Sequence, residues 1–191
     1  MLLFSAQVNS STLLILGDSL SAGYKMPIEQ SWPALLGEQL KRLDNTTTVV
    51  SASISGDTTG NGLARLPALL AEHKPSTVLI ELGANDGLRG FPIQTIRANL
   101  EQMITLIQAQ NSQALLLQIE LPANYGKRYT QAFSSLYPQL SERYKVPLLP
   151  FFMRPLIQSP QLIMADGLHP TVQAQPWIAE FMAKQLLIHL K

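Results

Sequence analysis

The segment Leu13-Leu14-Ile15-Leu16-Gly17-Asp18-Ser19 indicates the fold class, because an unbroken apolar run ends abruptly in Gly-Asp-Ser. Consecutive apolar residues of this kind are typical of a strand buried on both faces, as in a parallel sheet. Gly17 allows a sharp turn where the strand ends. Reactive groups of open α/β sheets collect at the carboxyl ends of strands, so Ser19 stands where a nucleophile would be placed. Most serines after strands form turns or cap helices, and Ser19 therefore needs partners elsewhere in the chain.

The composition narrows the classes of function. The chain has 191 residues, a length that predicts one domain with a sizeable core. Lys plus Arg total 14 and Asp plus Glu total 13, which gives a formal net charge of +1. Without a basic excess, nothing favours nucleic acid or a polybasic membrane patch as a partner. The sequence has no cysteine, which excludes a thiol nucleophile, disulfides and thiolate metal ligands.

Residues 1–10 are interpreted as a flexible N-terminus that precedes a single domain of residues 11–191. The apolar start, residues 1–7, lacks a basic region and is too short for a signal peptide. It is interpreted either as the remnant of a trimmed signal, with a small-residue site near Ala6, or as an ordinary frayed terminus. The first alternative predicts a periplasmic or secreted protein and the second leaves a cytoplasmic one. No apolar run approaches the roughly 20 residues that cross a bilayer, so stable membrane insertion is not expected.

Strand-like apolar runs alternate with amphipathic segments along the whole chain. Such alternation predicts an α/β protein, a three-layer α/β/α sandwich around a mainly parallel sheet of about five strands. Residues 83–90 and 150–167 are expected to be loop or irregular, and Pro138 is expected to kink a helix or end it early. The predicted strands are residues 11–16, 46–51, 77–82, 113–120 and 146–151, and the predicted helices are residues 31–43, 59–73, 92–110, 129–144 and 171–190.

Polar motifs follow the strand ends and converge on one rim of such a sheet. A serine nucleophile needs an imidazole to accept its proton, and the imidazole needs a carboxylate on its other nitrogen. His169 lies in a loop three residues after Asp166 and fits both requirements. Acyl transfer also builds an oxyanion, which needs preorganised N–H donors. We expect these donors to be the backbone N–H groups of Ser19 and Gly56 and the side chain of Asn85.

Four motifs carry a resemblance to a known family: Gly17-Asp18-Ser19-Leu20-Ser21, the lone Gly56, Gly83-Ala84-Asn85-Asp86 and Asp166-Gly167-Leu168-His169-Pro170. In order and spacing they resemble the sequence blocks of the SGNH (GDSL) hydrolase superfamily. Residues 83–91 and 121–129 further resemble its bacterial thioesterase I/protease I/lysophospholipase L1 and arylesterase branch. The resemblance implies a flavodoxin-like sheet and hydrolysis of carboxylic esters and thioesters through an acyl-enzyme on Ser19, with His169 as base and Asp166 orienting it.

The loops at the rim predict how the substrate binds. In the relatives, the loop of residues 86–91 lines the acyl site and moves. Its two glycines, Gly87 and Gly90, together with Gly83 favour mobility here. Arg89 is interpreted either as a contact for an anionic substrate group or as a solvated side chain. We expect a small-molecule ester or thioester as the partner, a monomer or weak oligomer, and no cofactor. No metal site is expected, because His73 and His189 lack paired ligand motifs. The predicted acyl contacts are Leu88, Phe91, Leu121, Pro122 and Tyr125.

The same residues allow other interpretations. Asp18 could be a second catalytic carboxylate, but a role in shaping the turn after the strand is the stronger interpretation. A carbohydrate O-deacetylase of the same superfamily would use the same residues, yet it calls for polar and sugar-stacking rim residues rather than Leu, Pro and Phe. A non-catalytic flavodoxin-like module for a phosphate ligand would need a phosphate loop at the first strand end, where Asp18 would repel the ligand.

Overall fold

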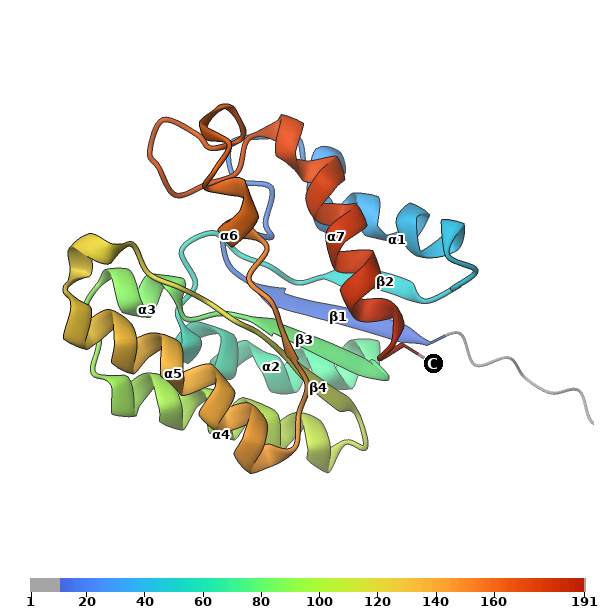
Figure 1. Cartoon of the computed structure of the whole chain (residues 1–191). Coiled ribbons are helices and arrows are strands. Elements are labelled where there is room, and N and C mark those ends of the chain that lie inside the picture. The colour runs from blue at the N-terminus through green and yellow to red at the C-terminus, as the bar shows by residue number, and fades with distance from the viewer. Residues whose placement is uncertain (1–10, 191) are drawn as a thin grey trace, which may run out of the picture.

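A parallel sheet of five strands in the order β2-β1-β3-β4-β5 forms the centre of the computed structural model, which describes residues 11–190 (Figure 1). The two central strands, β1 and β3, are paired in register from Leu13 with Thr77 to Gly17 with Glu81. The carboxyl ends of all strands therefore face one side of the molecule. The strands are β1 (Thr12–Gly17), β2 (Thr48–Ser51), β3 (Thr77–Glu81), β4 (Gln113–Leu117) and β5 (Leu148–Leu149).

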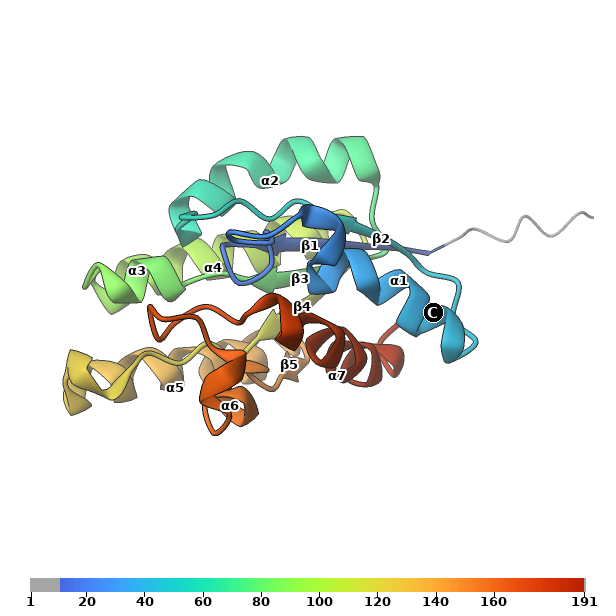
Figure 2. The same cartoon turned by 90° about the horizontal axis from the view of Figure 1, so that it is seen from above.

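Helices cover both faces of the sheet and complete the three layers (Figures 1 and 2). One layer holds α1 (Trp32–Arg42) and α7 (Gln175–Leu187), and the other holds α2 (Thr59–His73), α4 (Ile93–Ala109) and α5 (Lys127–Tyr144). The predicted α/β/α sandwich with a parallel five-stranded sheet is thereby confirmed. The shorter elements are the helices α3 (Ala84–Leu88) and α6 (Met153–Leu156) and the 3-10 turns η1 (Ile28–Gln30), η2 (Ala123–Tyr125), η3 (Pro160–Leu162) and η4 (Val172–Ala174).

Burial of the apolar strands holds the layers together. Leu13 to Leu16 of β1 are wholly buried, as are Val78 to Ile80 of β3. Burying one such side chain contributes about 2 kcal/mol, so the central strands form a rigid platform. The helix α4 adds one apolar face, made of Ile96, Leu100, Met103, Ile104 and Ile107. The loops at the carboxyl edge are thus anchored on the most deeply buried part of the molecule.

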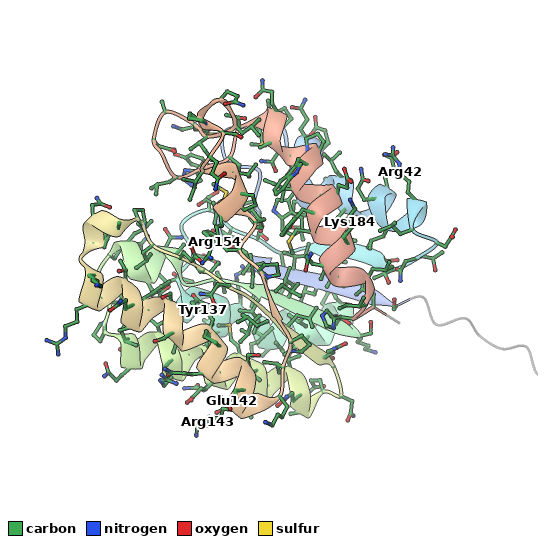
Figure 3. The ribbon with its side chains drawn as sticks, viewed as in Figure 1. Arg42, Tyr137, Glu142, Arg143, Arg154 and Lys184 are labelled. Atoms are coloured by element: carbon green, nitrogen blue, oxygen red, sulfur yellow. The ribbon has the colours of Figure 1, made fainter. Side chains whose placement is uncertain are left out.

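Several predicted elements were wrong. Residues 83–90 are not a plain loop, because they contain α3. Of the two expectations for Pro138, a kink or an early end of the helix, the early end is wrong, because α5 continues to Tyr144. Tyr137 of α5, labelled in Figure 3, is wholly buried, and its hydroxyl donates to the Leu82 carbonyl at 2.9 Å. Buried contacts beside Pro138 therefore outweigh its local cost within a helix.

The fifth strand and the segment after it also differ from the prediction. Only Leu148 and Leu149 pair as β5, since Pro147 and Pro150 on either side have no N–H to donate to a ladder. Residues 150–167 are not wholly irregular, because α6 and η3 lie within them. The predicted flexible N-terminus and signal remnant, residues 1–10, lie outside the described residues. Within residues 11–190, no helix has the length and apolar character needed to cross a membrane.

Candidate active site

The turn after β1 presents Ser19 at the carboxyl edge of the sheet. The Asp18 carbonyl accepts hydrogen bonds from the Ser21 and Ala22 N–H groups at 3.2 and 2.9 Å. The Asp18 carboxylate accepts from the Leu20 N–H at 3.0 Å, which gives Asp18 the predicted contact with the backbone of the turn. A side chain at Gly17 would not fit, because its Cβ would lie 2.6 Å from the Glu81 carboxylate. Glycine is therefore required at the strand end for close approach.

Ser19, His169 and Asp166 form one hydrogen-bonded chain. The Ser19 Oγ lies 2.8 Å from the His169 Nε2, and the His169 Nδ1 lies 2.8 Å from the Asp166 Oδ2. The other oxygen of Asp166 accepts from the backbone N–H groups of Leu168 and His169 at 2.9 and 3.0 Å. Partial burial raises the pKa of Asp166, but these hydrogen bonds outweigh it and lower the pKa to about 2. Asp166 is therefore ionised at neutral pH.

An aromatic ring fixes the plane of the imidazole. The rings of Tyr24 and His169 are stacked, with centroids 4.1 Å apart and planes 28° apart. Tyr24 lies in the loop after β1, so the Ser19 turn and the His169 loop contact each other twice. Sequence reasoning missed Tyr24, and only its place shortly after the Gly-Asp-Ser motif could have indicated it.

The expected oxyanion donors differ in whether they already donate a hydrogen bond within the protein. Within residues 11–190, no hydrogen bond uses the backbone N–H of Ser19 or Gly56. The Asn85 amide, in contrast, donates to the Asp18 Oδ2 at 3.1 Å and to the Asp57 carbonyl at 3.0 Å. The Asn85 side chain thus joins the loops after β1, β2 and β3. The two backbone donors are available to an oxyanion, whereas Asn85 must exchange one of its internal bonds.

Two arginines hold the loop that carries Gly56. The Arg65 Nε contacts the Asp57 carboxylate at 2.8 Å, and the Arg89 guanidinium donates to the Gly56 carbonyl at 3.2 Å. The side chain of Arg89 is exposed, and this hydrogen bond joins α3 to the loop after β2. The choice between a substrate contact and a solvated side chain stays a prediction.

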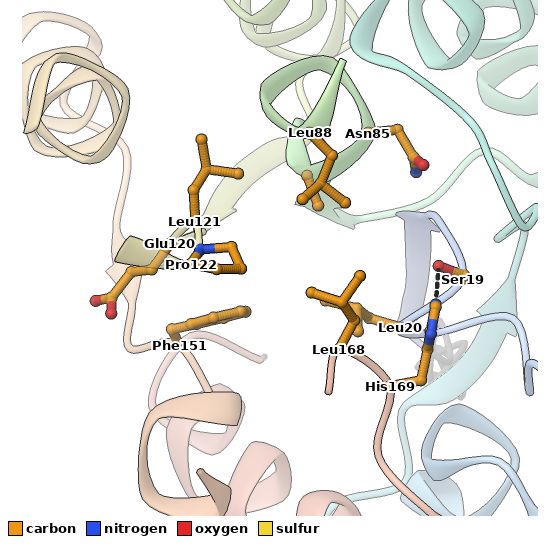
Figure 4. Close-up of a pocket in the computed structure, with 11 residues that line it drawn as sticks. Ser19, Leu20, Asn85, Leu88, Glu120, Leu121, Pro122, Phe151, Leu168 and His169 are labelled. Carbon is orange, nitrogen blue, oxygen red and sulfur yellow. Dashed lines mark hydrogen bonds between the residues drawn. The ribbon is translucent and has the colours of Figure 1, made fainter. Parts of the chain in front are cut away.

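A small apolar pocket of about 90 Å³ opens beside Ser19 and His169 (Figure 4). Three of the predicted acyl contacts line it, namely Leu88, Leu121 and Pro122. Phe91 and Tyr125 do not belong to this lining. Phe91 packs partly buried against the core, and Tyr125 is an exposed residue of η2. The remaining lining residues, which sequence reasoning missed, are Leu20, Ala84, Glu120, Phe151 and Leu168.

The added lining residues come from separate loops. Phe151 follows β5, and its place at the end of the strand predicted over residues 146–151 is the sequence signal that could have indicated it. Leu168 precedes His169 directly, so the loop that carries the imidazole also forms one wall. Figure 4 shows the Glu120 carboxylate directed away from Ser19, and it pairs with Arg154 outside the pocket. The surface that faces a bound substrate is therefore mainly apolar.

Glycines near the pocket serve close packing. A Cβ at Gly83 would lie 2.1 Å from the Tyr137 hydroxyl, and Gly83 also has a φ of +122°. A Cβ at Gly87 would lie 2.6 Å from the Leu121 side chain. The structure thus gives close packing as a reason for Gly83 and Gly87, while the mobility of this loop stays a prediction. In the part of the chain that the structure describes, no group of three or more His, Cys, Asp or Glu side chains could hold a metal ion.

At the edge of this parallel α/β sheet, a serine is hydrogen-bonded to an imidazole, and the imidazole is hydrogen-bonded to a carboxylate. This arrangement defines the class of the serine hydrolases. The model of the GDSL-like Lipase/Acylhydrolase family matches residues 15–175, and the chain belongs to this family. The resemblance drawn from the four motifs is therefore confirmed.

Named relatives agree with this assignment. An arylesterase of Vibrio mimicus is 56% identical over 98% of this chain and 94% of its own length. Thioesterase 1/protease 1/lysophospholipase L1 of Escherichia coli K12 is 56% identical over 93% of this chain and 84% of its own. Among solved structures, the psychrotrophic esterase EstA from Pseudoalteromonas sp. is similar at a TM-score of 0.90 and 42% identity, covering 94% of this chain and 98% of that one. The structure of TesA is similar at a TM-score of 0.89 and 46% identity, covering 94% and 100%.

Proposed function

We propose that the chain hydrolyses carboxylic esters and thioesters, with Ser19 as nucleophile, His169 as general base and Asp166 as the carboxylate that orients the imidazole. The hydrogen-bonded chain from the Ser19 Oγ through His169 to Asp166, with 2.8 Å at both links, carries this proposal. The names of the relatives, an arylesterase and a thioesterase/lysophospholipase, support both kinds of substrate.

The reaction follows from the positions of these side chains. The Ser19 Oγ attacks the acyl carbonyl carbon while its proton passes to the His169 Nε2. The tetrahedral oxyanion accepts hydrogen bonds from the backbone N–H groups of Ser19 and Gly56. The Asn85 amide redirects one N–H from the Asp57 carbonyl to the oxyanion, while its other N–H stays bonded to the Asp18 carboxylate. His169 then gives its proton to the leaving alcohol or thiol, which leaves an acyl-enzyme. A water molecule that loses its proton to His169 attacks the acyl carbon and releases the acid and the free serine.

The pocket beside Ser19 is proposed to bind the acyl group. Its walls are the side chains of Leu88, Leu121, Pro122, Phe151 and Leu168, all of which suit an aliphatic or aromatic acyl chain. An O-deacetylase would call for more polar and aromatic sugar-stacking residues than this lining offers, in which Phe151 is the one phenyl ring. Phe91 and Tyr125 are left out of the proposed contacts because they lie outside the pocket.

We further propose a location outside the cytoplasm, in the periplasm or secreted. The apolar start of residues 1–7 and the small residue Ala6 support this proposal. Fractionation of the native host, with the protein followed by an antibody, tests it, and the protein should appear in the periplasmic or extracellular fraction. Protein confined to the cytoplasmic fraction of the native host would refute the proposal.

The catalytic proposal is tested by activity and by covalent labelling. The wild-type chain should hydrolyse p-nitrophenyl butyrate, and a serine-reactive organophosphonate should label Ser19 and stop the reaction. Ser19→Ala should remove both activity and labelling while it leaves the fold unchanged. A wild-type chain that hydrolyses no ester and is not labelled at Ser19 would refute the proposal. A series of p-nitrophenyl esters beside acyl-CoA thioesters then separates the two substrate classes.

A further inference from the structure

A buried carboxylic acid lies directly beneath the Ser19 turn. Glu81, the last residue of β3, is wholly buried. Its Oε2 accepts a hydrogen bond from the Asp18 N–H at 3.2 Å and one from the Ser21 hydroxyl at 2.6 Å. These two contacts lie on either side of Ser19 in the chain. Glu81 therefore fastens the nucleophile turn of β1 to the neighbouring central strand.

Other carboxylates lie around Glu81, and among the described residues no cation forms an ion pair with it. Asp18 is also wholly buried, and its carboxyl group interacts with that of Glu81. Asp57 and Asp86 add further negative charge around Asp18. The nearby cation, Arg65, is bonded to Asp57 and reaches the turn only at the Gly17 carbonyl, at 3.5 Å. Two buried carboxyl groups side by side in such a place cannot both be ionised at low cost.

The hydrogen bonds show which of the two acids keeps the proton. Both carboxylate oxygens of Asp18 accept, Oδ1 from the Leu20 N–H and Oδ2 from the Asn85 amide. Glu81 uses only Oε2, and its Oε1 has no partner among the described residues. Burial raises the pKa of Glu81 well above its usual value, and Asp18 raises it further. Burial raises the pKa of Asp18 only to about 7, since Leu20 and Asn85 stabilise its ionised form.

We propose that Glu81 is a positioning residue of the hydrolase: as the neutral acid it fixes the Ser19 turn from below and leaves Asp18 free to hold the Asn85 amide. The nucleophile and the oxyanion donor are then connected through a single pair of buried acids. Displacement of a catalytic group by about 1 Å costs on the order of 10²-fold in rate, so this support acts on turnover rather than on substrate binding. This inference rests on the proposed function of Ser19.

The test compares Glu81→Ala with Glu81→Gln. The amide of Gln is neutral and its oxygen accepts the same two hydrogen bonds, so Glu81→Gln should keep kcat within about threefold of the wild type. Glu81→Ala removes both bonds and should lower kcat by about 10- to 100-fold with KM nearly unchanged. Labelling of Ser19 by the organophosphonate should slow by the same factor. Ser112→Ala serves as a control, because it removes a buried 2.6 Å hydrogen bond to Pro75 at the other end of the sheet and should leave kcat unchanged.

Thermal unfolding tests the neutral state separately and keeps the proposal testable if Glu81→Ala fails to fold. The pKa of Glu81 is raised in the folded state. Its contribution to the free energy of unfolding of the wild type is therefore largest below the ordinary pKa of 4.5 and is lost as the pH rises. Gln does not titrate. The Tm of Glu81→Gln relative to the wild type should therefore increase steadily from pH 5 to pH 9.

Distinct results separate the two proposals. Wild-type kcat and labelling rate in Glu81→Ala would refute the positioning role while the proposed function stands. Equal losses in the Gln and Ala variants, with a Tm difference that does not change with pH, would refute the neutral acid. A wild-type chain that is neither active nor labelled would refute the proposed function, and the role of Glu81 with it.

Discussion

The two sides of the site are built in opposite ways. The Ser19 turn continues a wholly buried strand and lies on the buried acids Asp18 and Glu81. The loop of His169 lies between α6 and α7, and the Asp166 side chain is 32% exposed. Burial raises the pKa of Asp18 to about 7, whereas hydrogen bonds lower the pKa of Asp166 to about 2 against the effect of its partial burial. The two aspartates thus differ in role: Asp18 is a buried support of the turn, and Asp166 carries a negative charge at neutral pH.

The loop side depends on local bonds instead of a buried strand. Met164 and His169 are joined by a backbone hydrogen bond of 2.8 Å, and Leu162 and Thr171 by another of 2.8 Å. An isolated antiparallel bridge pairs Ile163 with Pro170 between them. This closed loop holds Asp166 and His169 in one unit, so the imidazole can be oriented without a rigid sheet beneath it.

Among substitutions on the two sides of the site, removing the charge of Asp166 should lower kcat the most. Asp166→Asn leaves the imidazolium without its counter-charge and should lower kcat by about 10³-fold with KM nearly unchanged. Asp18→Asn should cost only about 10-fold, because Asp18 supports Asn85 and does not face the imidazole. Steady-state kinetics with p-nitrophenyl butyrate measure both. An equal loss in the two variants would show that the sides do not differ in this way.

Loss of the aromatic contact between the two sides should have a medium effect. Tyr24→Leu removes the ring that is stacked on His169 and should lower kcat by about 10-fold, because the imidazole loses the contact that holds its plane. Tyr24→Phe keeps the ring and should match the wild type within about twofold. A Leu variant that behaves like the Phe variant would exclude a role for the stacking.

The smallest expected effect is on stability at different pH. The lowered pKa of Asp166 gives stability that is present above the usual value of 3.8 and is lost as the pH falls toward 2. The raised pKa of Asp18 has the opposite effect, because ionising this buried group lowers the stability of the folded state as the pH rises from about 4 to 7. The Tm advantage of the wild type over Asp166→Asn should shrink on acidification, by about 2 °C because the group is partly exposed. The Tm of Asp18→Asn relative to the wild type should increase as the pH rises. Tm differences that change with pH in the same direction for Asp166→Asn and Asp18→Asn would contradict this account.

Much of the fold could be predicted because it depends on local patterns. The helix predicted over residues 59–73 is α2 with the same bounds, since Thr58 caps it and Lys74 ends it in a left-handed conformation. The helix α5 ends at Tyr144, where the predicted helix ends, but the expectation that Pro138 ends it early is wrong, because the buried Tyr137 outweighs the local effect of Pro138. Of the predicted acyl contacts, Phe91 and Tyr125 lie near the others in sequence but face the core and the solvent, and only the loop conformations show this.

The order of apolar runs and strand-end motifs was enough to assign the α/β class and the candidate residues, because periodicity and turn chemistry are local properties of the chain. Only the folded chain brings Ser19 within 2.8 Å of His169, 150 positions away, and places Glu81 beneath the Ser19 turn. These contacts depend on the order β2-β1-β3-β4-β5, which sets β1 beside β3. That order results from the packing of the whole core, and no single segment of the sequence contains it.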